Sequence, residues 1–232
     1  NNTADNGGGL YIPTYTVNVY DSTFTGNQAS GSSGAVHAGD AAFGLYKCVI
    51  TGNSAPQGAV HGFSGYTGGN PRFQNCLVVS NTATDGSGYT ILSSGGGGGG
   101  GNLTLLHTTL ADNTAPGGCV RAGNTSKSST ISVRNCILAA GSAGVGTGIH
   151  SDNTSITLAN NNVYNFSSAY GSAAVGQAVD SISEDPDFVD KEDGDYHLAT
   201  RSCRDIVLHV IATDIEGNSR PYNAKDEGID LG

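Results

Sequence analysis

The sequence contains no methionine and no tryptophan, and only 13% of its 232 residues are charged. Long helices need Ala, Leu, Glu, Lys and Met in quantity, so a helical bundle is excluded. No window approaches the run of about 18 apolar residues that a transmembrane helix requires. Basic residues number 10 against 20 acidic ones, and the net charge of −10 excludes nucleic acid as a partner, because binding phosphate needs a basic surface.

Cysteine is also scarce. The five cysteines are an odd number without a C-x-x-C pair, which indicates neither a dense disulfide framework nor a zinc site. The chain starts at Asn1 with neither an initiator methionine nor a signal peptide, so we expect a processed form or a piece of a longer protein. The composition, rich in Gly, Ser, Thr and Asn, favours a secreted or cell-surface protein.

What is present is 36 glycines and an apolar content of 37%, which is high enough to argue against disorder. The charge is unevenly placed, since 14 of the 20 acidic residues lie at or beyond Asp180. We therefore expect two regions with different physical properties, a nearly neutral body and an acidic C-terminal segment.

An internal repeat predicts the architecture. The triplet Asn-x-Ala recurs at intervals of 25, 26, 28 and 32 residues, starting at Asn2, Asn27, Asn53, Asn81 and Asn113. Short runs with the pattern of strands precede and follow each triplet, and no helical pattern lies between them. Turns of this length cannot bury an apolar face alone, but stacking at about 4.8 Å builds a continuous core. The sequence thus predicts an all-β fold, a parallel β-helix of about six irregular turns over residues 1–166.

Two columns of this repeat are expected to be structural. Asparagine tolerates the left-handed conformation at a bend and can donate its amide to the turn above, so we predict an internal ladder. Its members are Asn27, Asn53, Asn81 and Asn113. Cys48, Cys76 and Cys136 share a second column and are expected to be small buried side chains. A disulfide between Cys48 and Cys76 is the alternative, and it fits poorly because parallel side chains do not meet well. Gly95–Gly101 is expected to be a flexible excursion.

The C-terminal quarter carries phrases of a different kind. They read Asp-Pro-Asp-Phe-Val-Asp at 185–190, Asp-Tyr-His-Leu at 195–198, Thr-Asp-Ile-Glu-Gly-Asn-Ser-Arg-Pro at 213–221 and Glu-Gly-Ile-Asp-Leu-Gly at 227–232. These phrases resemble the closing segment of secreted bacterial right-handed parallel β-helix proteins, in the group whose helix ends before varied cell-surface anchors. The resemblance implies a right-handed coil and a cell-surface location. Cys203 stands where that family usually has proline, and the chain stops before the family's aromatic ending, so any anchor is expected to be absent.

Residues 167–232 are accordingly predicted to form a closing turn and an acidic cap, because charge, proline and covering loops blunt the open end of a solenoid. The spacing of the acidic residues could also gather oxygen ligands for Ca²⁺, although the full twelve-residue loop pattern is missing. The weak calcium candidates are Asp185, Asp187, Asp190, Asp193 and Asp195. No other cofactor is expected.

One outward column stands out as a candidate ligand-binding row, one residue after the inward aliphatic of each turn. Its members are Tyr11, His37, His61, Thr90, Arg121 and His150. The row could be ordinary solvent-facing residues, it could bind an extended acidic polysaccharide or a transition metal, or it could supply a catalytic base. Attraction to an acidic polymer is expected to be weak at pH 7.5, to strengthen towards pH 5.5 as the histidines gain protons, and to fade with salt.

An enzymatic role is the second reading. A glycoside hydrolase needs two carboxylates about 5–9.5 Å apart, and the six acids before residue 166 form no recurring pair. A polysaccharide lyase needs a base and a cation for the uronate, which only the row could offer. We predict a structural or adhesive module outside the cell and lean against an enzyme. End-to-end association into filaments is also expected, because the first turn begins without an evident cap.

Overall fold

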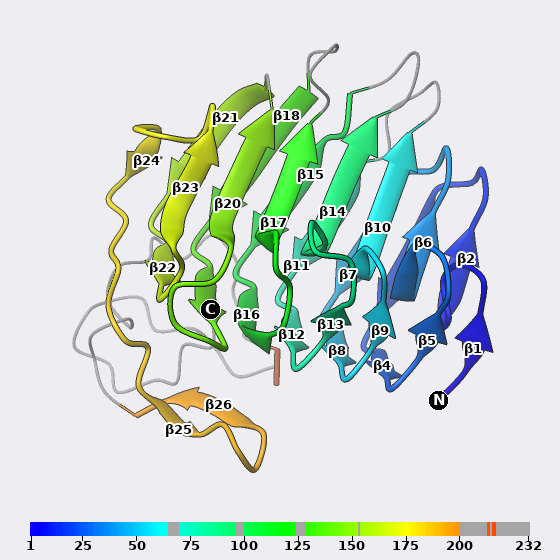
Figure 1. Cartoon of the computed structure of the whole chain (residues 1–232), viewed down its shortest axis with the longest axis horizontal. Helices are drawn as coiled ribbons and strands as arrows, with labels where there is room; N and C mark the ends of the chain where they lie inside the picture. The colour runs from blue at the N-terminus through cyan, green and yellow to red at the C-terminus, as the bar shows by residue number, and fades with distance from the viewer. Residues whose placement is uncertain are drawn as a thin grey trace.

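A computed structural model describes residues 1–64, 70–95, 100–123, 129–152, 154–199, 213, 215 and 216. The described residues form strands and turns and no helix. Among them there is accordingly no helix that could span a membrane. Parallel strands from successive turns stack side by side along one axis, from the N-terminal turn at the right of Figure 1 to the last turn at the left. The predicted all-β parallel β-helix is confirmed.

Two sheets of seven strands each form the broad faces of the coil. Sheet 1 contains β2 (Leu10–Ile12), β6 (Ser33–Ala38), β10 (Gly58–Ser64), β14 (Tyr89–Gly95), β17 (Gly118–Gly123), β20 (Thr147–Asp152) and β23 (Ser168–Ser172). Sheet 2 contains β3 (Val17–Tyr20), β7 (Phe43–Tyr46), β11 (Pro71–Gln74), β15 (Leu103–Leu106), β18 (Ser129–Arg134), β21 (Thr154–Ala159) and β24 (Ala178–Val179). β23 and β24 continue the two sheets past residue 166, where the repeat of the sequence fades.

Two narrower sheets close the cross-section. Sheet 3 has six strands, β4 (Thr23–Thr25), β8 (Val49–Thr51), β12 (Leu77–Val79), β16 (Thr109–Asn113), β19 (Ile137–Ala140) and β22 (Asn162–Tyr164). Sheet 4 has four, β1 (Thr3–Ala4), β5 (Gln28–Ala29), β9 (Ser54–Ala55) and β13 (Thr82–Ala83). Each strand pairs in register with its equivalent one turn away, so residues of one column share one environment along the axis.

The core is a continuous column of aliphatic and aromatic side chains inside the coil. Fully buried members include Phe43, Phe73, Ile91, Leu105 and Val133. Cys48, Cys76 and Cys136 are buried beside them as free thiols, and each thiol donates to the carbonyl two residues before it. The disulfide alternative is therefore not adopted, while Cys203 and residues 96–99 of the glycine run lie outside the described residues.

The corner between sheets 2 and 3 carries a second ladder that the sequence did not predict. One residue per turn has a φ between 46° and 55°, in the left-handed region. These residues are Asp21, Lys47, Asn75, His107, Asn135, Asn160 and Asp180. Asn160 donates its amide to Asn135 Oδ1 at 3.3 Å, and the Asn135 amide lies 3.1 Å from His107 Nε2. Asparagine and aspartate are favoured here because they tolerate this conformation.

The acidic C-terminal segment packs along the side of the coil. Its hairpin, β25 (Phe188–Asp190) and β26 (Asp195–Leu198), is antiparallel and lies below the coil in Figure 1. Phe188 and Tyr196 pack on the outer face of sheet 3, against Val79, Ala111 and Ala139. We call residues 185–199 the strap. It was predicted to cover the end of the solenoid, but it covers the apolar side chains that the middle strands of sheet 3 place on the outer face.

Candidate functional site

The outer face of sheet 1 brings most of the predicted row into one line. Tyr11 pairs with His37 and His37 with His61, while further along the axis Arg121 pairs with His150. The position between them is taken by Leu92, which pairs with both His61 and Arg121. The assignment of Thr90 to the row is wrong.

The register of β14 explains this correction. Ile91, and not Tyr89, aligns with Val60 of the turn before, because the connection from Ala83 to Ile91 is longer than that from Ala55 to Val60. Thr90 is therefore buried, at 2% exposure, next to the core. A long connection shifts a strand without changing its local pattern, so counting from the triplet failed here.

The N-terminal half of the row is a stack of rings. Tyr11 is 54% exposed, and its ring lies parallel to that of His37 with 5.5 Å between centroids. The rings of His37 and His61 meet edge to face at 5.3 Å. His61 is buried, and its Nε2 lies 2.8 Å from the hydroxyl of Ser94 on the next turn. The exposed ligand surface here is therefore Tyr11 and the rim of His37.

Burial disfavours the charged form of these imidazoles. It lowers the pKa of His37, and it lowers the pKa of His61 to about 3, with a smaller contribution from the nearby His37. A histidine with such a pKa stays uncharged at pH 5.5. The expectation that the row gains charge between pH 7.5 and 5.5 is therefore wrong for His61, and the lowered pKa of His37 works against it too.

The other half of the row is a polar cluster centred on Asp152. Arg121 donates to Asp152 Oδ2 through Nε at 2.8 Å and through Nη2 at 2.7 Å. His150 Nε2 lies 2.9 Å from the other oxygen, Oδ1. Burial raises the pKa of Asp152, but the hydrogen bonds and charges of Arg121 and His150 outweigh it and leave that pKa below its ordinary value. The carboxylate is ionised at neutral pH and holds both side chains in place.

Tyr89 completes the cluster from two turns away. The Arg121 guanidinium carbon lies 5.7 Å from the centre of its ring, and the His150 ring centre lies 6.0 Å away. A Cβ at Gly117 would stand 2.8 Å from Tyr89 Cε2, so the ring needs glycine at this position. Burial raises the pKa of the Tyr89 phenol, which stays protonated. We call Tyr89, Arg121, His150 and Asp152 the polar cluster.

The comparison with protein families bears on this half of the coil. Residues 102–218 match the model of a family described as disaggregatase related, and this stretch is half of the chain. The chain belongs to the disaggregatase-related family. No curated protein and no solved structure matches it.

The matched residues include only the C-terminal half of the row. Arg121, His150, Asp152 and the strap lie inside the residues typical of the disaggregatase-related family, whereas Tyr11, His37, His61 and Tyr89 precede them. The family match concerns the domain and its β-helix. The group with varied cell-surface anchors stays a prediction from the closing phrases.

The asparagine column runs through the interior beside the site. Each amide donates to the side-chain oxygen of the next, with distances of 3.2 Å for Asn2 to Asn27, 3.0 Å for Asn27 to Asn53, 2.9 Å for Asn53 to Asn81 and 3.0 Å for Asn81 to Asn113. The backbone N–H of each donor points to the same oxygen. The column supplies the hydrogen bonds of this corner of the coil, and Asn27, Asn53 and Asn81 are buried there.

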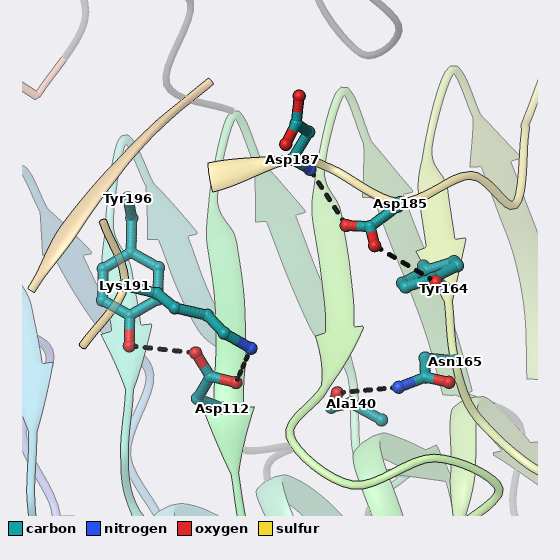
Figure 2. A network of polar contacts seen from close by, with 8 residues as sticks. All are labelled: Asp112, Ala140, Tyr164, Asn165, Asp185, Asp187, Lys191 and Tyr196. Atoms are coloured by element: carbon teal, nitrogen blue, oxygen red, sulfur yellow. Dashed lines mark hydrogen bonds and ion pairs between the residues drawn. The ribbon is translucent and has the colours of Figure 1, made fainter. Parts of the chain in front are cut away.

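Three of the five predicted calcium ligands accept hydrogen bonds from nearby backbone groups in this family member. Asp185, Asp190 and Asp195 each accept a backbone N–H two or three residues later. Figure 2 shows Asp185 also receiving the Tyr164 hydroxyl, at 3.3 Å. Within the described part of the chain, no three His, Cys, Asp or Glu side chains are grouped so that they could hold a metal ion. The five carboxylates do not come together as one site.

Two members of the polar cluster were missed by sequence reasoning. Asp152 follows His150 by two residues, and residues two apart point to the same face of a strand, so this signal was available. Tyr89 could not be found, because it leans over two turns towards His150 and its place depends on the glycine at 117.

Proposed function

We propose that this disaggregatase-related β-helix is a secreted or cell-surface module that binds a polysaccharide along the outer face of sheet 1. One observation carries the proposal: a tyrosine, two histidines, a leucine, an arginine and a third histidine stand in line over successive turns. An extended polymer lying along the axis meets a new turn about every 4.8 Å. The name of the family refers to disaggregation, and a protein that engages polymer chains is compatible with it.

The chemistry of the row supports a carbohydrate. Tyrosine offers an apolar ring face with a polar tip, which suits a sugar that has both apolar and hydroxyl-bearing faces. Arg121 and His150 are fixed by Asp152 and so are already arranged for hydrogen bonding, which lowers the entropy lost on binding. The Arg121 charge is balanced by Asp152, so this face recognises shape and hydrogen bonds more than net charge.

The experiment is affinity electrophoresis or calorimetry with a panel of neutral and acidic polysaccharides. Tyr11→Ala and Arg121→Ala should each weaken binding by about five-fold or more, the equivalent of about 1 kcal/mol. Tyr20→Ala is the matched control, because Tyr20 is 57% exposed but lies on sheet 2. Affinity should change little with salt.

Two results would contradict the proposal. One is a panel in which no polysaccharide binds. The other is binding that Tyr20→Ala removes and Tyr11→Ala leaves intact, which would place the ligand on sheet 2.

A further inference from the structure

His150 has the arrangement of a catalytic base. Its Nε2 faces an ionised carboxylate, which can only accept, so Nε2 carries the proton and Nδ1 carries the lone pair. Nδ1 is kept open by the next turn, where Gly171 lies in register with His150. A Cβ at Gly171 would stand 2.9 Å from Nδ1. The glycine therefore leaves room for a proton donor at this nitrogen.

Arg121 supplies a cation beside this base. It uses Nε and Nη2 for Asp152, which leaves the two hydrogens of Nη1 for a ligand as far as the described residues show. The side chain is 37% exposed, so a ligand carboxylate can reach it. Both oxygens of Asp152 are already hydrogen-bonded and its side chain is almost buried, which limits its repulsion of an anion.

Tyr89 supplies an acid next to these two groups, and only 7% of its surface is exposed. Its phenol is protonated, and its ring lies against both the guanidinium of Arg121 and the ring of His150. A base, an acid and an anion-binding cation in one cluster are the groups that removal of a proton next to a carboxylate requires.

We propose that the polar cluster is a catalytic centre that cleaves a uronate-containing polysaccharide by β-elimination. The proposal rests on the proposed function, since the polymer must first lie along the row. His150 Nδ1 takes the proton from C5 of the uronate, and the electron pair of that bond forms the C4=C5 double bond. The C4–O4 bond breaks, and O4 takes the proton of the Tyr89 phenol. Water then returns the proton from His150 to Tyr89, and no other reactant is needed.

The roles of the four residues follow from these contacts. His150 and Tyr89 are the catalytic residues, and Arg121 offsets the charge that grows on the uronate carboxylate as the proton leaves. Asp152 is a positioning residue that fixes the tautomer of His150. The histidines nearer the N-terminus are poor bases for this step, because burial lowers the pKa of both, that of His61 to about 3.

The test uses the full chain with pectate, alginate and chondroitin sulfate, and follows the ultraviolet absorbance of the C4=C5 product. We expect the absorbance to rise with the unmodified protein on one of these polymers. His150→Ala should lower the rate by about 100-fold or more, the usual contribution of a general base. Gly171→Ala should also lower kcat, because its methyl group covers Nδ1. Asp152→Asn should lower kcat with KM within two-fold.

Matched variants separate this centre from a loss of fold or of binding. Arg134→Ala removes an exposed arginine of sheet 2 and should leave the rate unchanged, and melting curves should show that His150→Ala and Gly171→Ala fold. Tyr11→Ala should raise KM and keep kcat. Binding of the polymers without any product would overturn the catalytic centre and leave the binding face standing. A protein that neither binds nor cleaves any of them would overturn both, and full activity in His150→Ala would assign the reaction to other residues.

Discussion

Asn53 shows how one side chain can serve a whole corner of the coil. Its oxygen accepts the backbone N–H and the amide of Asn27, and its own amide donates to Phe24 O, Thr51 O and Asn81 Oδ1. The residue is fully buried, so each of these partners would lose its hydrogen bond without gaining one to water. An interior polar residue is tolerated here because its hydrogen-bonding capacity is filled.

We therefore expect Asn53→Ala to lower the free energy of unfolding by about 1–3 kcal/mol, the cost of leaving buried polar groups unpaired. Asn81→Ala should behave in the same way, and denaturant unfolding measures both. Asn18→Ala is the control, because Asn18 is exposed on sheet 2. Equal midpoints for Asn53→Ala and the unmodified protein would remove the ladder from the stability of the fold.

His61 makes the stability depend on pH. Its pKa is about 3 in the folded protein and about 6.5 in the unfolded chain, so the unfolded state binds more protons between these values. Stability should rise with pH across this window and be lost on acidification below pH 6.5, by up to about 1.4 kcal/mol per pH unit. Denaturant midpoints measured from pH 7 to pH 4 test this.

His61→Phe keeps a ring of similar size and removes the titrating group. Its stability should fall less steeply on acidification than that of the unmodified protein. Parallel pH dependences for the two proteins would show that the pKa of His61 is not lowered by folding.

The strands that follow the asparagine triplet could be predicted because the repeat places the same residue types in the same column. The expectation failed where a connection changes length, as it does before Ile91, because only tertiary pairing fixes how far the strand slides. The corner ladder through His107, Asn135 and Asn160 was missed for another reason. Its members differ in chemistry and share only a left-handed backbone, which the sequence pattern does not display directly.

The strap could be recognised as acidic but not placed. The signal for its position lies in sheet 3, where Leu77, Val79 and Ala111 put apolar groups on the outer face. An apolar outer face predicts that some segment of the chain packs on it, but it does not identify that segment. The strap comes from residues far along the chain, and its contacts with Asp112 span about 80 positions of sequence.

Asp112 holds the strap to sheet 3. Figure 2 shows Lys191 and the hydroxyl of Tyr196 converging on its two oxygens, each at 3.3 Å. Asp112→Asn keeps a residue that tolerates the φ of 50° at this corner but removes the negative charge. We expect the hairpin amides to exchange with solvent about two- to five-fold faster, as suits an exposed ion pair of about 0.5–1 kcal/mol.

Hydrogen exchange resolved by peptide measures this effect. Asp85→Asn is the control, because the side chain of Asp85 accepts hydrogen bonds from Ser87 of its own turn. Faster exchange throughout the coil would show that Asp112 supports the solenoid and not the strap alone.

The coil presents open strand edges in the described structure. β1, β2, β3 and β4 are each the outermost strand of their sheet. The backbone N–H groups of Val17 and Asp21 donate to the carbonyls of Ala42 and Tyr46 in the next turn. Because successive N–H groups alternate in direction along a strand, the N–H of Asn18 points away from that turn, towards the open end of the coil. Exposed edges of this kind are templates for pairing with another chain.

We expect the purified chain to self-associate as its concentration rises, with light scattering as the measurement. Asn18→Pro should reduce this association, because proline removes an outward N–H from the edge strand and is tolerated there. Its melting temperature should stay close to that of the unmodified protein. A stable monomer at high concentration would show that these edges do not pair with one another.

The asparagine ladder gives the coil interchangeable units. The turns differ in length, with 25 to 32 residues between successive asparagines, yet every junction uses the same pair of donors and the same acceptor. Any two asparagines of the series can therefore meet across a junction, whatever loop lies between them. Excising residues 28–53 would bring Asn27 against Asn81 and shorten the binding row by one aromatic position. In such a scaffold, insertion or deletion of whole turns can lengthen or shorten the row on sheet 1, and the length of the coil becomes a property that evolution adjusts independently of the chemistry of each turn.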